Sequence, residues 1–241
     1  MDPFSRIRFL LGNEAMKKLQ NATVAVFGLG GVGGYVVEAL ARSGIGHLVL
    51  VDHDTISPTN LNRQILATHD TVGCSKAETA KQRVLAINPE AQVEAIQIMY
   101  LPETADQFDF ASYSYVVDAI DTVTGKLTLV QAAQKANVPI ISCMGTGNKL
   151  DPTAFRVADI YETSGCPLAR IMRKECRRRG IPQLKVVYSL EEPMAPVIGP
   201  EDPAWAELPQ GRNALPGSSA FVPGTAGLIL ASQVVRDLTG I

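Results

Sequence analysis

Thr23-Val24-Ala25-Val26-Phe27-Gly28-Leu29-Gly30-Gly31-Val32-Gly33-Gly34 is the stretch that decides the fold of this 241-residue chain. Its short apolar, β-branched run predicts a strand over 23–27, and the residues after the glycines predict a helix over about 32–43. Between them Gly28, Gly30 and Gly33 stand in G-x-G-x-x-G spacing. Such a turn presents a helix N-terminus to an anion, so it indicates a nucleotide phosphate without distinguishing NAD, FAD and ATP.

Strand and helix patterns alternate through the next hundred residues. Strands are predicted over 47–51, 92–97, 115–120 and 139–144, and helices over 76–87 and 122–136. This alternation predicts an α/β fold, a Rossmann-like, mostly parallel sheet with helices on both faces. After residue 147 the rhythm changes, and strand patterns over 155–160 and 185–189 predict antiparallel strands that extend the sheet in the C-terminal half.

The two ends of the chain read differently. Residues 4–19 predict one or two short helices broken near Gly12, and a terminal helix is predicted over about 225–238. The segment 190–217 contains six prolines and the only tryptophan, which is typical of a binding loop, a lid or a partly disordered segment.

Composition excludes several classes of protein. A net charge of −2 gives no general reason to bind nucleic acid or an anionic membrane, so any basic surface must be local. The four cysteines form no C-x-x-C pair, which argues against a zinc ribbon and for reduced thiols. No apolar run reaches the ~18 residues of a membrane span, and no leader pattern opens the sequence. We therefore expect a cytoplasmic protein without a transmembrane segment.

The residues after the glycines narrow the choice of nucleotide. Asp52 directly follows the second strand, near the ~20-residue spacing expected for a carboxylate that binds ribose hydroxyls. Arg63 and Lys76 are fixed cations that suit a triphosphate, and Asp121 at the mouth of a strand suits Mg²⁺. A second mononucleotide half and a hydride-transfer site are not evident. The set indicates that ATP activates an acid, with transfer of AMP and loss of pyrophosphate.

Four motifs together carry a family resemblance. They are Gly-Leu-Gly-Gly-Val-Gly at 28–33, Asn-Leu-Asn-Arg-Gln at 60–64, Lys76, and Asp-Ala-Ile-Asp at 118–121. The chain resembles the adenylation domain of the ThiF/MoeB/HesA and ubiquitin-activating superfamily over about its first 150 residues. The resemblance implies ATP and Mg²⁺ as cofactors and a homodimer. It implies that Arg63 and Lys76 hold the triphosphate, Asp52 the ribose and Asp121 the metal, with Asn60 aligning the α-phosphate. The implied nucleotide-binding set also includes Gly28, Gly30, Gly31, Gly33, Gln64 and, reaching the partner subunit's ATP, Arg6.

The second half is similar to one branch of that superfamily, the tRNA threonylcarbamoyladenosine dehydratases. The similarity rests on Lys-Leu-Asp-Pro-Thr at 149–153, Val-Ala-Asp-Ile at 157–160 and the run 163–170, while 191–217 matches no motif. It implies that ATP activates the threonyl carboxylate of a modified adenosine in the tRNA anticodon loop, and that a ring then closes with net loss of water. We predict a single domain over 1–241, with a nucleotide-binding half at 22–150 and a substrate, tRNA and dimer half at 151–241.

A basic segment over 170–180 fits a tRNA substrate. As a helix it would present cations that could bind phosphates, against the alternative of a solvated helix face. The candidate tRNA contacts are Arg170, Arg173, Lys174 and Arg177. Cys166 is a candidate nucleophile or sulfur acceptor, with an incidental thiol as the alternative. Cys74, Cys143 and Cys176 are interpreted as packing residues, and the three histidines as structural.

Two other functions stay open at this point. One is an adenylyltransferase that activates the C-terminal Gly-Gly of a sulfur-carrier protein. Missing zinc cysteines and the basic segment argue against it. The other is a nucleotide-binding scaffold that docks a cysteine desulfurase or sulfur-acceptor partner without chemistry. The intact set of Arg63, Lys76 and Asp121 argues against that.

Overall fold

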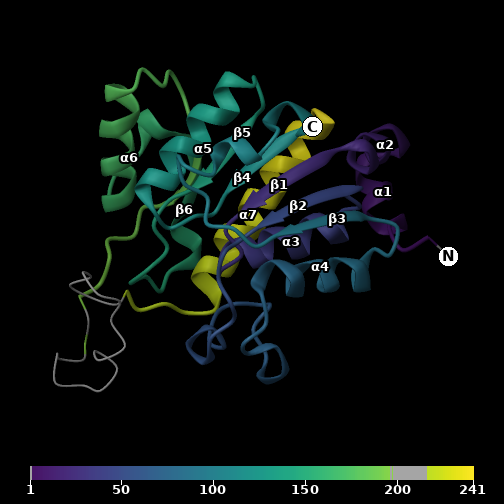
Figure 1. Ribbon diagram of the computed structural model, residues 1–241. Coiled ribbons are helices and arrows are strands. Elements are labelled where there is room, and N and C mark those ends of the chain that lie inside the picture. Colours follow the sequence, from purple (N-terminus) through teal and green to yellow (C-terminus); the bar gives the residue numbers. More distant parts are fainter. Residues whose placement is uncertain (1, 196, 198–215) are drawn as a thin grey trace.

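A computed structural model describes residues 2–195, 197 and 216–241, and within them one sheet of seven strands forms the centre of the protein (Figure 1). The strand order is β3-β2-β1-β4-β5-β7-β6. Most of the predicted proline-rich loop, 196 and 198–215 with the tryptophan, lies outside the described residues. The strands are β1 (Thr23–Phe27), β2 (His47–Val51), β3 (Gln92–Ile96), β4 (Tyr115–Asp118), β5 (Ile140–Cys143), β6 (Phe155–Asp159) and β7 (Lys185–Ser189).

The sheet is parallel except at one edge. β1 pairs in parallel with both β2 and β4, and only β6 runs against its neighbour, with Phe155 opposite Ser189 of β7. The predicted fold class is confirmed, although β7 itself is parallel to β5 rather than antiparallel. The reason is the helix between the last two strands: α6 (Pro167–Arg178) returns the chain to the edge at which β5 begins.

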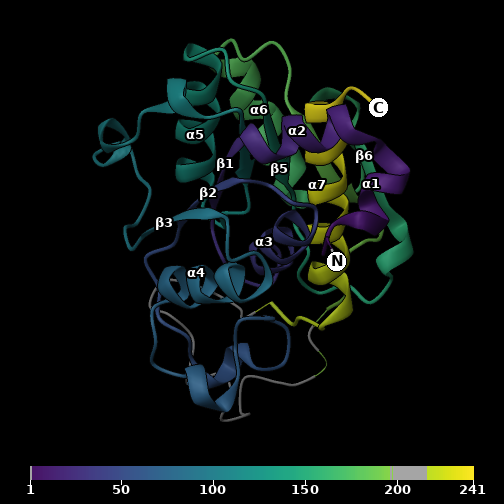
Figure 2. The ribbon, with the colours of Figure 1, turned by 90° about the vertical axis from the view of Figure 1, so that its right-hand side faces the viewer.

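Helices cover both faces of the sheet (Figures 1 and 2). α3 (Gly33–Arg42), α4 (Lys76–Ile87) and α7 (Phe221–Thr239) pack on one face, and α5 (Val123–Lys135) with α6 on the other. Side chains alternate accordingly: Val24 and Val26 join the core under α3 and α7, while Ala25 and Phe27 join the core under α5. Burial on both faces explains the near-continuous apolar runs of the central strands.

The terminal helix is longer than its sequence pattern predicts. It begins at Phe221 rather than near 225, with Pro223 in its first turn, where a missing N–H costs no hydrogen bond. It crosses α3 closely, because a Cβ on Gly227 would lie 2.4 Å from the Val32 oxygen. No helix in the described ranges is long and apolar enough to cross a bilayer.

The N-terminal segment forms two helices, α1 (Ser5–Leu11) and α2 (Asn13–Asn21), as predicted. They part at Gly12, whose φ of 81° is a conformation that favours glycine. α2 lies beside the end of α7 in both views, and Lys18 donates to the Thr239 oxygen at 3.0 Å (Figures 1 and 2).

Candidate adenylation site

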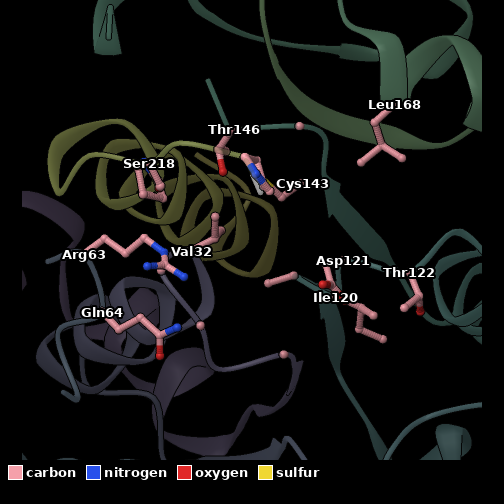
Figure 3. Close-up of a pocket in the computed structure, with 18 of the residues that line it drawn as sticks. Val32, Arg63, Gln64, Ile120, Asp121, Thr122, Cys143, Thr146, Leu168 and Ser218 are labelled. Atoms are coloured by element: carbon pink, nitrogen blue, oxygen red, sulfur yellow. The ribbon is translucent and has the colours of Figure 1, made fainter. Parts of the chain in front are cut away.

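A cavity of about 1050 Å³ opens where the parallel strands β1, β2, β4 and β5 end. Figure 3 shows Arg63 and Gln64 reaching into it from one side and Asp121 facing them from the other. The carboxyl edge of such a sheet is the usual ligand position in open α/β folds. Nine of the predicted nucleotide-site residues line this one cavity: Gly28, Gly30, Gly31, Asp52, Asn60, Arg63, Gln64, Lys76 and Asp121.

The glycine turn is packed too tightly for side chains at two of its positions. A Cβ on Gly28, where φ is 88°, would lie 2.6 Å from the Ala119 oxygen, and one on Gly33 would lie 1.7 Å from the Gly28 oxygen. Around Gly30 the nearest atom to such a Cβ is Gln64 Nε2, at 3.7 Å. Gly33 does not line the cavity, so it closes the turn, whereas Gly30 leaves its backbone open to a ligand.

Asp52 ties the end of β2 to the glycine turn. Its carboxylate accepts the Leu29 N–H at 2.6 Å and the Asp54 N–H at 2.9 Å, and its side chain is almost buried. Lys76, the first residue of α4, is also buried and donates to Asp54 Oδ2 at 2.8 Å. Asp54 is a cavity residue that sequence reasoning missed, although its spacing of two residues from Asp52 was visible.

The segment 58–64 supplies a cation and an amide on one wall. Arg63 is half-buried, and burial lowers the pKa of its guanidinium, which donates to the Thr59 oxygen and to Asn62 Oδ1. Asn60 is buried and uses Oδ1 to accept the Ser57 N–H at 3.1 Å. Gln64 Oε1 is buried without a hydrogen-bond partner among the described residues. A buried unpaired amide oxygen points to a ligand that donates to it, and the amide nitrogen of the same side chain is the atom nearest to a Cβ built on Gly30.

The opposite wall combines the ends of β4 and β5 with the start of α6. Asp121 stands at the cavity as an exposed carboxylate, and Thr146 and Leu168 line the same wall (Figure 3). Cys166 is buried and also lines the cavity, at the N-cap position of α6. This wall carries thiol, hydroxyl and apolar groups together with the Asp121 carboxylate and the buried Lys149, whereas Arg63 and Lys76 belong to the first wall.

The cysteines differ in their surroundings. Cys143 and Cys176 are buried, as expected of packing residues, and burial raises the pKa of their thiols to about 12 and about 11. Cys143 lines the cavity as well. The interpretation of Cys74 as a packing residue was wrong, because Cys74 is exposed in the turn that precedes the N-cap of α4.

Predicted residues outside the cavity fall into two groups. Arg6 is exposed on α1 and does not line the cavity of its own chain. Of the tRNA candidates on α6, Arg170, Lys174 and Arg177 are exposed, and Arg177 lies 5.3 Å from the centre of the Tyr161 ring. Arg173 differs: it is half-buried and donates to the oxygen and Oγ1 of Thr163 at 2.7 and 2.6 Å. Its guanidinium is therefore committed to holding α6 in place.

Comparisons with known proteins agree with this geometry. The ThiF family model matches residues 4–241. The chain is 42% identical to the tRNA threonylcarbamoyladenosine dehydratase of Bacillus subtilis, over 98% of this chain and 94% of that protein. Crystal structures of Escherichia coli tRNA N6-threonylcarbamoyladenosine dehydratase with ATP and with AMP each superpose with a TM-score of 0.87, over 99% of this chain and 94% of theirs, at 31% and 32% identity. With a family match across nearly its whole length, the chain belongs to the ThiF family.

Proposed function

We propose that this protein is an ATP-dependent tRNA threonylcarbamoyladenosine dehydratase. The observation that carries the proposal is the cavity itself, which joins a phosphate-binding turn, Arg63 and Lys76 to a second wall formed by Asp121 and the start of α6. The similar proteins named above carry this activity in their names, and one of them was crystallised with ATP and with AMP. The nucleotide side fits ATP because Gly30 leaves its backbone open and Gln64 Oε1 lacks a partner among the described residues.

The reaction divides into two transfers at one carboxylate. In the first, the threonyl carboxylate attacks the α-phosphorus of ATP, an acyl-adenylate forms and pyrophosphate leaves. In the second, the carbamoyl group attacks the activated carbonyl carbon, a ring closes and AMP leaves. The net loss is one water, with its oxygen carried away on AMP. Both steps need positioning and charge stabilisation rather than a protein nucleophile, so Cys166 has no required part.

The phosphate wall is proposed to bind and orient ATP. Arg63 and Lys76 contact the triphosphate, with Lys76 exchanging its bond to Asp54 for a phosphate oxygen. Asp52 accepts from the ribose hydroxyls, and the side-chain amide nitrogens of Asn60 and Gln64 donate to the α-phosphate. Each of these side chains lines the cavity, and charge-assisted hydrogen bonds to phosphate are about twice as strong as neutral ones.

Asp121 is proposed to hold Mg²⁺ together with phosphate oxygens. Its donor set fits, because Mg²⁺ is usually bound by one or two carboxylates plus substrate phosphates. Asp121 lines the cavity opposite Arg63 (Figure 3). Magnesium bound at Asp121 would supply positive charge that offsets the charge developing on the departing pyrophosphate.

The exposed cations of α6 are proposed to contact tRNA phosphates. Arg170, Lys174 and Arg177 are exposed, and the N-terminal end of their helix lines the cavity through Cys166, Pro167 and Leu168. A tRNA loop that delivers its modified base to the cavity would pass this helix. Arg173 belongs to the packing of α6 and is left out of this surface.

A homodimer is proposed from the outer face of α1. Phe9 and Leu10 are 82% and 83% exposed, and Arg6 lies three and four residues before them on the same helical face. Large apolar side chains exposed together mark interaction surfaces. A second copy covering this face would bring Arg6 to the partner, where it could reach the partner's ATP. We further propose that the protein is a single adenylation domain and lies in the cytoplasm. A cysteine desulfurase system stays a candidate partner.

The function is tested by one reaction with two substrates. The purified chain is incubated with ATP and Mg²⁺ and either tRNA containing threonylcarbamoyladenosine or a sulfur-carrier protein with a C-terminal Gly-Gly. We expect AMP and the cyclised nucleoside, measured by mass spectrometry, only with tRNA. AMP formed only with the carrier protein would make the chain an adenylyltransferase, and binding of ATP without AMP in either mixture would make it a scaffold.

A further inference from the structure

Lys126 is a fully buried cation on α5 to which the proposed function gives no role. Its ammonium donates to Asp118 Oδ2 at 3.0 Å and to the Cys143 oxygen at 2.8 Å. The side chains of Lys126 and Asp118 are 1% and 0% exposed. Asp118 is the last residue of β4 and Cys143 the last of β5, so one ammonium joins a helix to the carboxyl ends of two neighbouring strands.

The carboxylate that Lys126 holds shapes the turn leading to Asp121. Asp118 Oδ1 accepts the Ile120 N–H at 3.1 Å, which closes a turn of the Asx type between β4 and α5. The same turn contains Ala119, whose backbone packs closely against Gly28. A Cβ on Gly28 would lie 2.6 Å from the Ala119 oxygen. The turn therefore joins the phosphate-binding glycines to Asp121, three residues beyond Asp118.

The bond to Cys143 extends this arrangement to the other wall. Cys143 begins the run 143–149, all of which lines the cavity, while Lys126 itself does not line it. Lys126 thus acts beneath the floor of the cavity, through the two strand ends that it connects. A buried ion pair returns little net stability over an apolar pair of similar volume, so its benefit is better explained by the geometry that it imposes.

We propose that Lys126 is a positioning residue for ATP activation, holding the turn 118–121 so that Asp121 faces the phosphate wall. The proposal rests on the function proposed above and on the metal-binding role given there to Asp121. It assigns to Lys126 no contact with ATP, metal or tRNA.

The test is a double-mutant cycle on the magnesium dependence of ATP affinity. ATP dissociation constants are measured by calorimetry with and without Mg²⁺ for wild type, Lys126→Met, Asp121→Asn and the double variant. We expect Mg²⁺ to tighten ATP binding to wild type about tenfold, and each single variant to lose most of that gain. The metal-free constants should stay within about twofold, and the double variant should bind no more weakly than Asp121→Asn. Hydrogen exchange of residues 118–122 should rise in Lys126→Met.

Two further variants separate positioning from stability. Lys126→Met leaves a buried carboxylate unpaired, so Asp118→Asn with Lys126→Met serves as a folded form without either charge, and it should lose the same magnesium dependence. Lys135→Met, on the exposed last turn of α5, is the matched control and should behave as wild type. Three results would overturn the proposal. The first is full magnesium dependence of ATP affinity in the Asp118→Asn, Lys126→Met variant, and the second is that the losses in Lys126→Met and Asp121→Asn add independently. The third is that Mg²⁺ has no effect on ATP affinity in wild type. None of these measurements uses tRNA, so failure of the dehydratase reaction would be recognised separately.

Discussion

The two walls of the cavity are built in different ways. The phosphate wall depends on backbone packing at the glycine turn, where a Cβ on Gly28 or Gly33 would overlap a backbone oxygen. The opposite wall is held by cationic helix side chains that donate to backbone oxygens, Lys126 of α5 to Cys143 and Arg173 of α6 to Thr163. The difference teaches that the glycine turn of the first wall tolerates few side chains. On the second wall, the residues that line the cavity can be substituted as long as Lys126 and Arg173 keep their hydrogen bonds.

The largest effect is expected on the phosphate wall, from Arg63→Ala. Removing a preorganised charge beside a reacting phosphate typically costs about 10²–10³ in rate, so AMP formation with tRNA should fall by that factor. The free energy of unfolding should change by less than about 1 kcal/mol, because Arg63 is only half-buried. Steady-state kinetics and urea unfolding measure the two quantities, with Lys135→Ala as control. A loss of stability that matched the loss of rate would place Arg63 with the structural residues instead.

The glycine turn permits a sharper test within one motif. Gly33→Ala places a methyl group 1.7 Å from the Gly28 oxygen and should lower the free energy of unfolding by about 2–3 kcal/mol. Gly30→Ala meets no atom within 3.4 Å and should leave stability within about 0.5 kcal/mol. Its methyl group faces the cavity, however, so ATP affinity should fall about tenfold. Thermal unfolding and calorimetry separate the two variants, and normal ATP binding by Gly30→Ala would contradict the assignment of the phosphate position.

On the second wall, substitutions on α6 should distinguish the residue that stabilises the helix from the residues that bind tRNA. Arg173→Ala leaves the oxygen and Oγ1 of Thr163 without their donor and should cost about 1–2 kcal/mol of stability. The Arg170→Ala, Lys174→Ala double variant should keep its stability and lower the dependence of tRNA affinity on salt by about two phosphate contacts. Filter binding over a salt series provides the measurement. An unchanged salt slope in the double variant would remove α6 from the tRNA surface.

The smallest effect concerns the thiols. Cys143 and Cys176 have pKa values raised by burial to about 12 and about 11, above the ~8.5 of an unfolded thiol. The folded chain keeps these thiol protons up to a higher pH than the unfolded chain does. The free energy of unfolding therefore has its full value below about pH 8.5 and falls as pH rises toward the folded-state pKa values. We expect a loss of about 1 kcal/mol per thiol at pH 9.5. Urea unfolding at pH 7 and 9.5 should show it, and Cys143→Ala with Cys176→Ala should reduce it. Cys74→Ala, at an exposed thiol, should leave it unchanged.

The features that could be predicted from the sequence are local ones, and those that were missed depend on tertiary packing. The strands over 23–27 and 47–51 were found from periodicity and Asp52 from its position after a strand, which are local signals. Arg63 and Lys76 were found from their charge and from the family motifs, and both line the cavity. The commitment of Arg173 to Thr163 was missed because it depends on how α6 packs, which charge alone does not indicate. Lys126 was missed for the same reason: a lysine within a helix is ordinarily solvated, and only the tertiary fold buries it.

The direction of β7 and the start of α7 show two further limits. β6 and β7 pair antiparallel as predicted, but β7 also pairs in parallel with β5, because a strand pattern carries no information on the sense of each pairing. Pro223 and Gly224 are read locally as helix breakers, yet Pro223 is tolerated in the first turn and Gly224 packs against the Tyr35 ring. The contact of Gly224 with Tyr35 of α3 is a tertiary contact that the local pattern does not indicate.

The crossing of α7 over α3 bears on how the protein is made. During synthesis the glycine turn and α3 emerge early, but the apolar face of α3 is covered only when residues 222–235 of α7 leave the ribosome. At about 5–20 residues per second, that face stays open for roughly ten seconds or more. Contacts between distant parts of a chain also slow folding. The glycine turn of the nucleotide site is thus synthesised early, but its packing is completed only when α7 has been made. The need for chaperones should increase with the delay between these two events.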